Sequence, residues 1–140
     1  MAPAPLTPLY RLYQTLGTVA APLALRLARK RFEARQGPMP RFGERKGHAS
    51  IPRPQGKLIW MHTVSVGEFL SVLDLLRDLV AADVSLLVTT TTSSAADLAE
   101  QRLPDGVIHQ FAPVDTPMAV RRFLDHWRPD LVTFVESEIW

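Results

Sequence analysis

The feature that most constrains the fold is an alternation of two hydrophobic periods between residues 57 and 136. Short apolar runs of strand length alternate with longer segments in which apolar residues recur every three or four positions, as on one face of a helix. The runs that predict strands are 57–62, 84–90, 106–113 and 130–136, and the segments that predict helices are 67–82, 92–103 and 115–128. This order is typical of an α/β fold, in which crossover helices connect the strands of a parallel sheet.

The composition is that of a globular chain of about one domain. Of the 140 residues, 46% are hydrophobic and 21% are charged, which argues against disorder. The chain has no cysteine, which excludes disulfides and thiolate metal sites. The histidines lack metal-site spacing, and neither common phosphate-binding glycine motif occurs. The basic residues have few aromatic neighbours, so no nucleic-acid partner is predicted.

An uncharged apolar segment, residues 12–25, lies between Arg11 and Arg26. It is shorter than the ~20 residues that cross a bilayer, and Gly17 and Pro22 weaken it as a helix. A secretory signal would need a small-residue cleavage site after this segment, whereas a basic cluster follows it. A structural helix is a second interpretation. The basic flank favours a third, a helix that associates with an anionic membrane surface and leaves the chain after Arg26 on the cytoplasmic side.

Residues 37–56 are dense in proline, glycine and charge, and they show no hydrophobic period. Such a composition predicts a solvated linker. The predicted organisation is therefore a membrane-associating helix with its basic flank in residues 1–36, a linker in 37–56, and a folded domain in 57–140.

Candidate functional residues follow the predicted strands, because ligands of parallel α/β sheets bind outside the carboxyl ends of the strands. His62 ends the first strand and is either a ligand contact or an ordinary core histidine. Glu68 lies in the turn that leads into the first predicted helix. The residues alone favour a simple complement to the helix dipole there, with a pocket carboxylate as the alternative. The run Thr89–Ser94 holds more hydroxyl groups than helix capping requires, and Thr91 is its candidate ligand contact.

Two further acids, Glu136 and Glu138, follow the last predicted strand. One residue separates them, so in an extended chain their side chains would point the same way. Paired carboxylates can share acid and base roles, but ordinary polar residues at the end of a sheet would look the same.

Four stretches of the chain resemble motifs of one known family, the bacterial 3-deoxy-D-manno-octulosonic acid (Kdo) transferases, which glycosylate lipid A. These stretches are RFGERKG, HTVSVGE, LLVTTTT and APVDTPMAVRRFLDHWRPDLVTFVESEIW. The apolar N-terminus also resembles the membrane-association segment of that family. The resemblance spans nearly the whole chain. Its most specific part is the combination of two motifs, HTVSVGE and ESEIW.

The resemblance implies an inverting, metal-independent glycosyltransferase of the GT-B type. It would transfer Kdo from CMP-Kdo to a lipid A precursor, lipid IVA, at the cytoplasmic face of the bacterial inner membrane, with no cofactor besides this donor substrate. The chain would supply the Rossmann-like acceptor domain, and a separate domain would bind CMP-Kdo. By motif position, Glu68 corresponds to the general base and Glu136 to a residue that supports the transition state. Ser65 and Gly67 correspond to the turn that shapes the acceptor pocket.

The chain also departs from the family pattern. Ser137 and Ile139 replace a threonine and a leucine of the last motif, and TTTTSSA replaces TTTTPTG, which changes the expected shape of the loop after Thr92. Relatives continue beyond Trp140 into the donor domain, so the 140-residue chain alone is expected to be inactive. The alternatives are a membrane-tethered module that binds acceptor lipid without catalysis, and a fragment with no function of its own.

Overall fold

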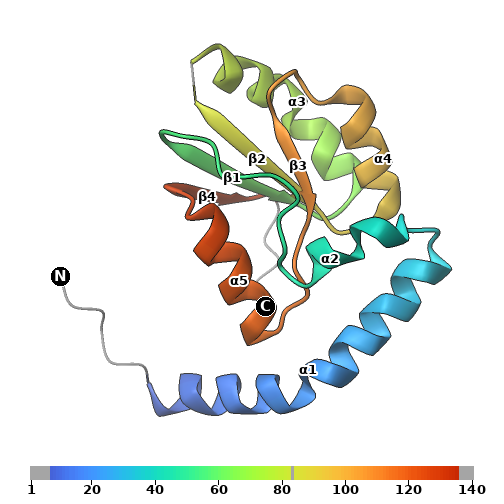
Figure 1. Cartoon of the computed structure of the whole chain (residues 1–140). Coiled ribbons are helices and arrows are strands. Elements are labelled where there is room, and N and C mark those ends of the chain that lie inside the picture. The colour runs from blue at the N-terminus through green and yellow to red at the C-terminus, as the bar shows by residue number, and fades with distance from the viewer. Residues whose placement is uncertain (1–6, 83, 136–140) are drawn as a thin grey trace.

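The computed structural model describes residues 7–82 and 84–135 and has an α/β architecture (Figure 1). Two helices and a 3-10 turn precede an alternation of strands and helices. The elements are α1 (Pro8–Ala34), η1 (Met39–Arg41), α2 (Phe42–Arg45), β1 (Leu58–Thr63), α3 (Val66–Ala81), β2 (Ser85–Thr90), α4 (Ser93–Arg102), β3 (Ile108–Phe111), α5 (Pro117–Trp127) and β4 (Leu131–Phe134). All four predicted strands and all three predicted crossover helices are therefore present.

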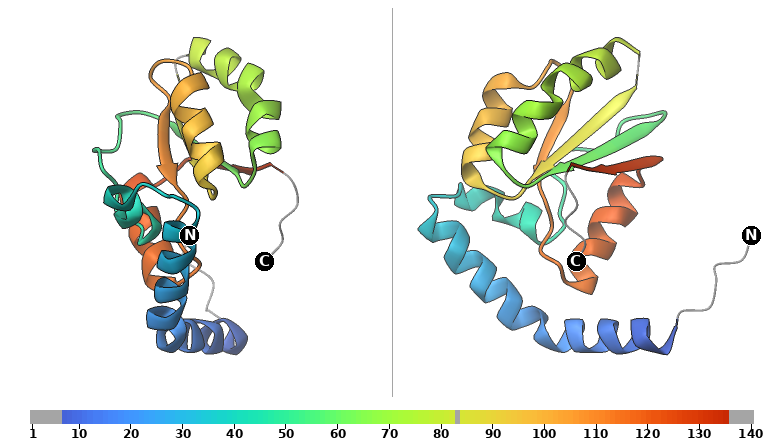
Figure 2. Two further views of the ribbon diagram at one scale, coloured as in Figure 1. Left: turned by 90° about the vertical axis from the view of Figure 1, so that its right-hand side faces the viewer. Right: turned by 180° about the vertical axis from the view of Figure 1, so that it is seen from behind.

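The sheet is parallel throughout, with strand order β3-β2-β1-β4. Helices α3 and α4 cover one face and α5 covers the other (Figure 2). Since side chains alternate along a strand, Met61 of β1 packs in the core under α3, whereas Leu58 packs with Phe123 and Trp127 of α5. The predicted Rossmann-like α/β arrangement is confirmed.

Hydroxyl side chains begin each of the three crossover helices. The side chains of Ser65, Thr92 and Thr116 accept a hydrogen bond from the backbone N–H three residues later, which satisfies one of the free donors of the first turn. Pro117 occupies the first position of α5, where it has no N–H to leave unpaired. These caps fix where each helix begins, and so fix the loops that follow the carboxyl ends of β1 and β2.

Helix α1 is 27 residues long and lies below the carboxyl ends of the strands (Figure 1). Phe32 is its buried side chain, and the ring packs against Phe42 and Phe111 with centroids 5.6 and 5.0 Å away. The helix bends near its middle (Figure 1), and its interior Pro22 is an ordinary cause of such a bend. No helix in the described residues is both long and apolar enough to cross a membrane.

The prediction that residues 37–56 form a solvated tether is wrong for the part around α2. Phe42, Glu44 and Gly47 are buried, and the segment is hydrogen-bonded to the sheet and to α5 along its length. The His48 carbonyl accepts from the Gln110 side chain, and Arg53 donates to the Trp127 carbonyl. The sequence pattern failed here because these contacts are made by backbone groups and single polar side chains, which produce no hydrophobic period.

The centre of this attachment is the buried carboxylate of Glu44. Its Oε2 accepts from the backbone N–H of Phe111 at 2.7 Å, on the side of β3 that faces away from β2. Arg41 donates to both carboxylate oxygens, at 2.7 and 2.9 Å. A buried carboxylate is tolerated when it is paired and hydrogen-bonded in this way, and the edge strand gains a partner for its free N–H.

His109 extends this network inside β3. Arg41 can only donate, so the contact of its Nη2 with His109 Nδ1 at 3.0 Å makes Nδ1 the acceptor. The proton is then on Nε2, which donates to Thr90 Oγ1 at 3.0 Å. Burial, and to a lesser extent the charge of Arg41, lower the pKa of His109 to about 4. His109 is therefore a neutral structural link between Arg41 of η1 and Thr90 of β2 at neutral pH.

Gly47 provides a test of how tightly this segment is held. Its φ is +84°, and a Cβ at this position would lie 2.1 Å from the carbonyl oxygen of Ala119 in α5. Gly56 has a similar φ of +81°, but a Cβ there would meet nothing within 4 Å. We expect Gly56→Ala to lower the free energy of unfolding by about 1 kcal/mol, which is the backbone cost alone. Gly47→Ala should cost about 2 kcal/mol more, because the overlap adds to that cost.

The comparison is made by denaturant unfolding of the two variants and the parent protein. Equal losses in the two variants would contradict the close packing of residues 41–48 against α5.

Candidate active site at the carboxyl ends of the strands

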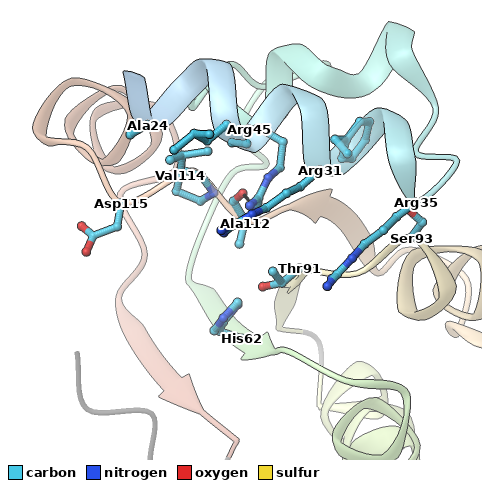
Figure 3. A pocket seen from close by; sticks show the side chains of 14 residues that line it. Ala24, Arg31, Arg35, Arg45, His62, Thr91, Ser93, Ala112, Val114 and Asp115 are labelled. Carbon is cyan, nitrogen blue, oxygen red and sulfur yellow. Dashed lines mark hydrogen bonds between the residues drawn. The ribbon is translucent and has the colours of Figure 1, made fainter. Parts of the chain in front are cut away.

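A cavity of about 540 Å³ lies between α1 and the carboxyl ends of β1, β2 and β3 (Figure 3). This is the edge of the sheet at which the strand order predicts ligand binding. The lining residues come from α1, from α2 and from the segments at the ends of the three strands. They are Ala24, Leu27, Ala28, Arg31, Phe32, Arg35, Arg45, His62, Thr91, Ser93, Ala112, Pro113, Val114 and Asp115. Two predicted site residues, His62 and Thr91, are therefore brought together in one cavity.

His62 is held by a hydroxyl group of the neighbouring strand. Its Nδ1 lies 2.8 Å from Thr89 Oγ1, which also accepts from the indole nitrogen of Trp60 at 2.9 Å. With Nδ1 engaged, Nε2 is the ring nitrogen left for a ligand. Burial lowers the pKa of His62; the nearby charge of Glu68 opposes this shift, and the charge of Arg45 adds to it. The ring is thus neutral at neutral pH.

Glu68 lies in the first turn of α3, and its carboxylate folds back over the helix N-terminus. One oxygen accepts from the backbone N–H of Val64, and the other accepts from the Ser65 hydroxyl at 3.0 Å. The Ser65 Oγ in turn accepts from the Glu68 N–H at 3.3 Å. This reciprocal arrangement resembles a capping box, so Glu68 does complement the helix N-terminus as the simpler interpretation predicts.

The same contacts control the protonation of Glu68. Burial raises the pKa of the carboxyl group, but the hydrogen bonds from Val64 and Ser65 outweigh it, and the pKa is lowered from its ordinary value. The carboxylate is therefore ionised and fixed in position at neutral pH. A helix cap and a base are compatible roles for it, since each oxygen has a second lone pair.

The predicted site residues divide into two groups. Ser65, Gly67 and Glu68 lie on the turn after β1 and do not line the cavity, whereas His62 connects the two regions. Thr92 Oγ1 donates to the Val64 carbonyl at 3.4 Å and links this turn to the loop after β2.

The outer side of the turn is open, because a Cβ at Gly67 would meet nothing within 4 Å. The other predicted acids, Glu136 and Glu138, lie outside the described residues.

Sequence reasoning missed the three arginines of the cavity, Arg31, Arg35 and Arg45 (Figure 3). They belong to the basic cluster that was assigned to a membrane-facing flank and a linker. Arg31 and Arg35 are four residues apart, so continuing the helical pattern to Ala34 would have placed both on one face. No sequence signal points to Arg45, whose position depends on the attachment of α2 to β3.

Within residues 7–82 and 84–135, no group of three or more histidine or acidic side chains is arranged to hold a metal ion. The polar atoms of the cavity are instead guanidinium, hydroxyl and imidazole groups, with Asp115 at its margin. Such a lining can bind an anionic or polyhydroxylated ligand.

The chain is similar to 3-deoxy-D-manno-octulosonic acid transferases. Residues 40–140 match the family described as 3-deoxy-D-manno-octulosonic-acid transferase (kdotransferase). A probable mitochondrial 3-deoxy-D-manno-octulosonic acid transferase of Arabidopsis thaliana is 43% identical over 134 residues, which are 94% of this chain and 30% of that protein.

Two bacterial 3-deoxy-D-manno-octulosonic acid transferases match as well. The Rickettsia typhi protein is 40% identical over 59% of this chain and 18% of its own length. The Haemophilus influenzae protein is 34% identical over 67% of this chain and 22% of its own length. The chain thus spans less than a third of the length of these curated relatives. No solved structure matches it significantly.

The hydrogen bonds to Glu68 predict how its pKa responds to mutation. Ser65→Ala removes a donor to the carboxylate, so the pKa of Glu68 should rise toward or above its ordinary value. Ser71→Ala is the matched control, because the Ser71 hydroxyl donates to the Glu68 backbone carbonyl instead. The pKa of Glu68 in each variant can be measured by NMR titration of the Glu68 carboxyl carbon. An unchanged pKa in Ser65→Ala would show that this contact does not hold the carboxylate.

Proposed function

Because the chain belongs to the family of 3-deoxy-D-manno-octulosonic acid (Kdo) transferases, we propose that it forms the acceptor-binding part of an enzyme that transfers Kdo from CMP-Kdo to a lipid A precursor. The observation that carries the proposal is the ionised carboxylate of Glu68, fixed on a rigid strand-to-helix turn next to a cavity at the carboxyl ends of the strands. The donor CMP-Kdo would bind in a second domain of the GT-B type.

The chemistry requires a base on the acceptor side. An acceptor hydroxyl that attacks the anomeric carbon of Kdo must lose its proton as the new C–O bond forms, while the bond to the CMP phosphate breaks. A carboxylate can accept this proton directly, and CMP leaves as a phosphate monoester anion, so a single inverting displacement needs neither a metal nor a covalent intermediate. Glu68 is the proposed base, and the preformed hydrogen bonds from Val64 and Ser65 orient it.

The remaining predicted residues take supporting roles in this proposal. The Nε2 of His62 faces the acceptor from the cavity, and Thr91 offers a hydroxyl group to it. Gly67 keeps the turn open for the acceptor sugar. Glu136 would support the transition state, and Glu138 would contact the substrate; both follow the fourth strand in the sequence.

Helix α1 is proposed to lie on the cytoplasmic surface of the inner membrane. Five of its apolar side chains recur at intervals of three and four residues, and all are exposed. They are Leu9, Leu12, Leu16, Val19 and Leu23. An exposed apolar stripe on a helix with basic residues suits a membrane interface that contains anionic lipids.

The membrane proposal predicts a specific loss of vesicle binding. Replacing Leu16 and Val19 with glutamate should weaken co-sedimentation with phosphatidylglycerol-containing vesicles by about tenfold or more, because apolar area is lost and charge is introduced. The matched control replaces Leu70 and Leu75, two exposed leucines of α3, with glutamate. Equal binding of the two double variants would contradict a role for the stripe.

The catalytic proposal predicts that Glu68→Gln lowers kcat for Kdo transfer by about 10²- to 10⁴-fold. The amide keeps one hydrogen-bond acceptor of the same shape but cannot accept the proton of the acceptor hydroxyl. Transfer from CMP-Kdo to lipid IVA is measured with the protein as its gene encodes it. Asp74→Asn is the control, because it makes the same chemical change on the exposed surface of the same helix.

Absence of transfer by the parent protein would contradict the proposed reaction. Full activity of Glu68→Gln would instead assign the base to another group. A module that only binds acceptor lipid would show no transfer and would keep its lipid affinity in Glu68→Gln.

A further inference from the structure

Three guanidinium groups converge on the cavity from two separate segments. Arg31 and Arg35 extend from α1 toward the floor of the cavity, where Thr91 and His62 lie, and Arg45 enters from the end of α2 (Figure 3). Like charges gathered around one cavity repel each other, so an anion between them would make this arrangement more favourable.

The described part of the chain supplies no carboxylate that pairs with these arginines. Of its five ion pairs, none includes Arg31, Arg35 or Arg45. Arg45 donates to the Ala112 carbonyl, which uses one of its five N–H groups. The acid at the cavity margin, Asp115, accepts a hydrogen bond from the Tyr13 hydroxyl at 2.8 Å.

Neighbouring arginines behave differently. Arg29 pairs with Glu33 one turn later in α1, and Arg41 pairs with Glu44 and Glu100. Arg31, Arg35 and Arg45 share the lack of an ion pair within the described residues with other arginines such as Arg26, and they differ from these in lining the cavity.

The rest of the lining suits a phosphate group. Thr91 and Ser93 offer hydroxyl donors, and Ser93 is the first residue of α4, whose N-terminus carries a partial positive charge. A guanidinium group can donate two parallel hydrogen bonds to two oxygens of one phosphate group. Three positive charges can also balance the charge of a doubly charged phosphomonoester. The neutral His62 adds a donor or an acceptor without further charge.

We propose that Arg31, Arg35 and Arg45 form a binding site for a phosphate group of the acceptor lipid. The identity of that lipid rests on the proposed function, whereas the phosphate site rests on the cavity itself. Helix α1 supplies Arg31 and the exposed apolar stripe that precedes it, and Arg35 is the residue that follows the helix. One helix would thus contact the bilayer through one side and direct a lipid phosphate group toward the turn of Glu68.

Binding of a small phosphomonoester tests the site without any transfer reaction. Glucosamine 1-phosphate is titrated into the 140-residue chain by calorimetry. Glucosamine, which lacks the phosphate group, is the control ligand. We expect saturable binding of the phosphate only, and a loss of about tenfold or more in the double variant Arg31→Gln/Arg35→Gln. Both side chains are exposed and form no ion pair within residues 7–82 and 84–135, so the variant should keep the melting temperature of the parent.

The matched control is Arg26→Gln/Lys30→Gln, which removes the same charge from exposed positions of the same helix that do not line the cavity. It should keep parent-like affinity. An equal loss of affinity for glucosamine 1-phosphate in the two double variants would show that only the overall positive charge matters, and it would overturn the proposed site. Parent-like binding by Arg31→Gln/Arg35→Gln would also overturn it.

A CMP titration distinguishes the two sources of phosphate in the proposed reaction. If CMP binds more tightly than glucosamine 1-phosphate and depends on the same arginines, the site belongs to the donor and the assignment to the acceptor is overturned. In the transfer assay, Arg31→Gln/Arg35→Gln should raise KM for lipid IVA about tenfold or more and leave KM for CMP-Kdo unchanged. A parent protein that binds glucosamine 1-phosphate but transfers no Kdo would contradict the proposed reaction and leave the phosphate site standing.

Discussion

The buried contact between Glu44 and the edge of β3 is the interaction on which the rest of the site depends. It pairs a strand N–H that faces away from the sheet, and it fixes α2 against β3. The next residue, Arg45, then reaches the cavity, and its backbone carbonyl accepts from Val114 in the loop after β3. Phe42 of the same short helix supports Phe32, the buried anchor of α1. Without the Glu44 contact, α2 would no longer support α1, which is the helix that covers the cavity.

Charge is distributed in this protein according to whether it serves the fold or remains free for a ligand. Arg41 serves the fold, because its guanidinium group donates hydrogen bonds to the buried Glu44 carboxylate and to the neutral ring of His109. Arg31 and Arg35 face the cavity with no carboxylate partner in the described chain. Beyond His62, the carboxylate of Glu68 is kept ionised by hydrogen bonds. A negative carboxylate beside a positively charged cavity suits the proposed acceptor, which would carry both hydroxyl and phosphate groups.

Much of the candidate site could be predicted from residue order alone. The strand-end rule places His62 and Thr91 at the edge of the sheet where the structure has a cavity, because the carboxyl ends of parallel strands must meet at one edge. The same rule places Glu68 on the neighbouring turn but cannot tell that its carboxylate folds back onto Val64 and Ser65. It also cannot identify Arg45 as a cavity residue, since that depends on a contact between segments more than sixty residues apart in the chain.

The sequence by itself determined the order of strands and helices along the chain and the edge of the sheet at which a ligand is expected. These follow from local periodicity and from the handed, parallel connection of strands. Only the tertiary structure decided that residues 41–48 are packed against the domain and that α1 covers the cavity, with Arg31 and Arg35 among the lining residues. The physical reason is that a few long-range hydrogen bonds and one aromatic cluster make these contacts, and neither leaves a periodic trace in the sequence.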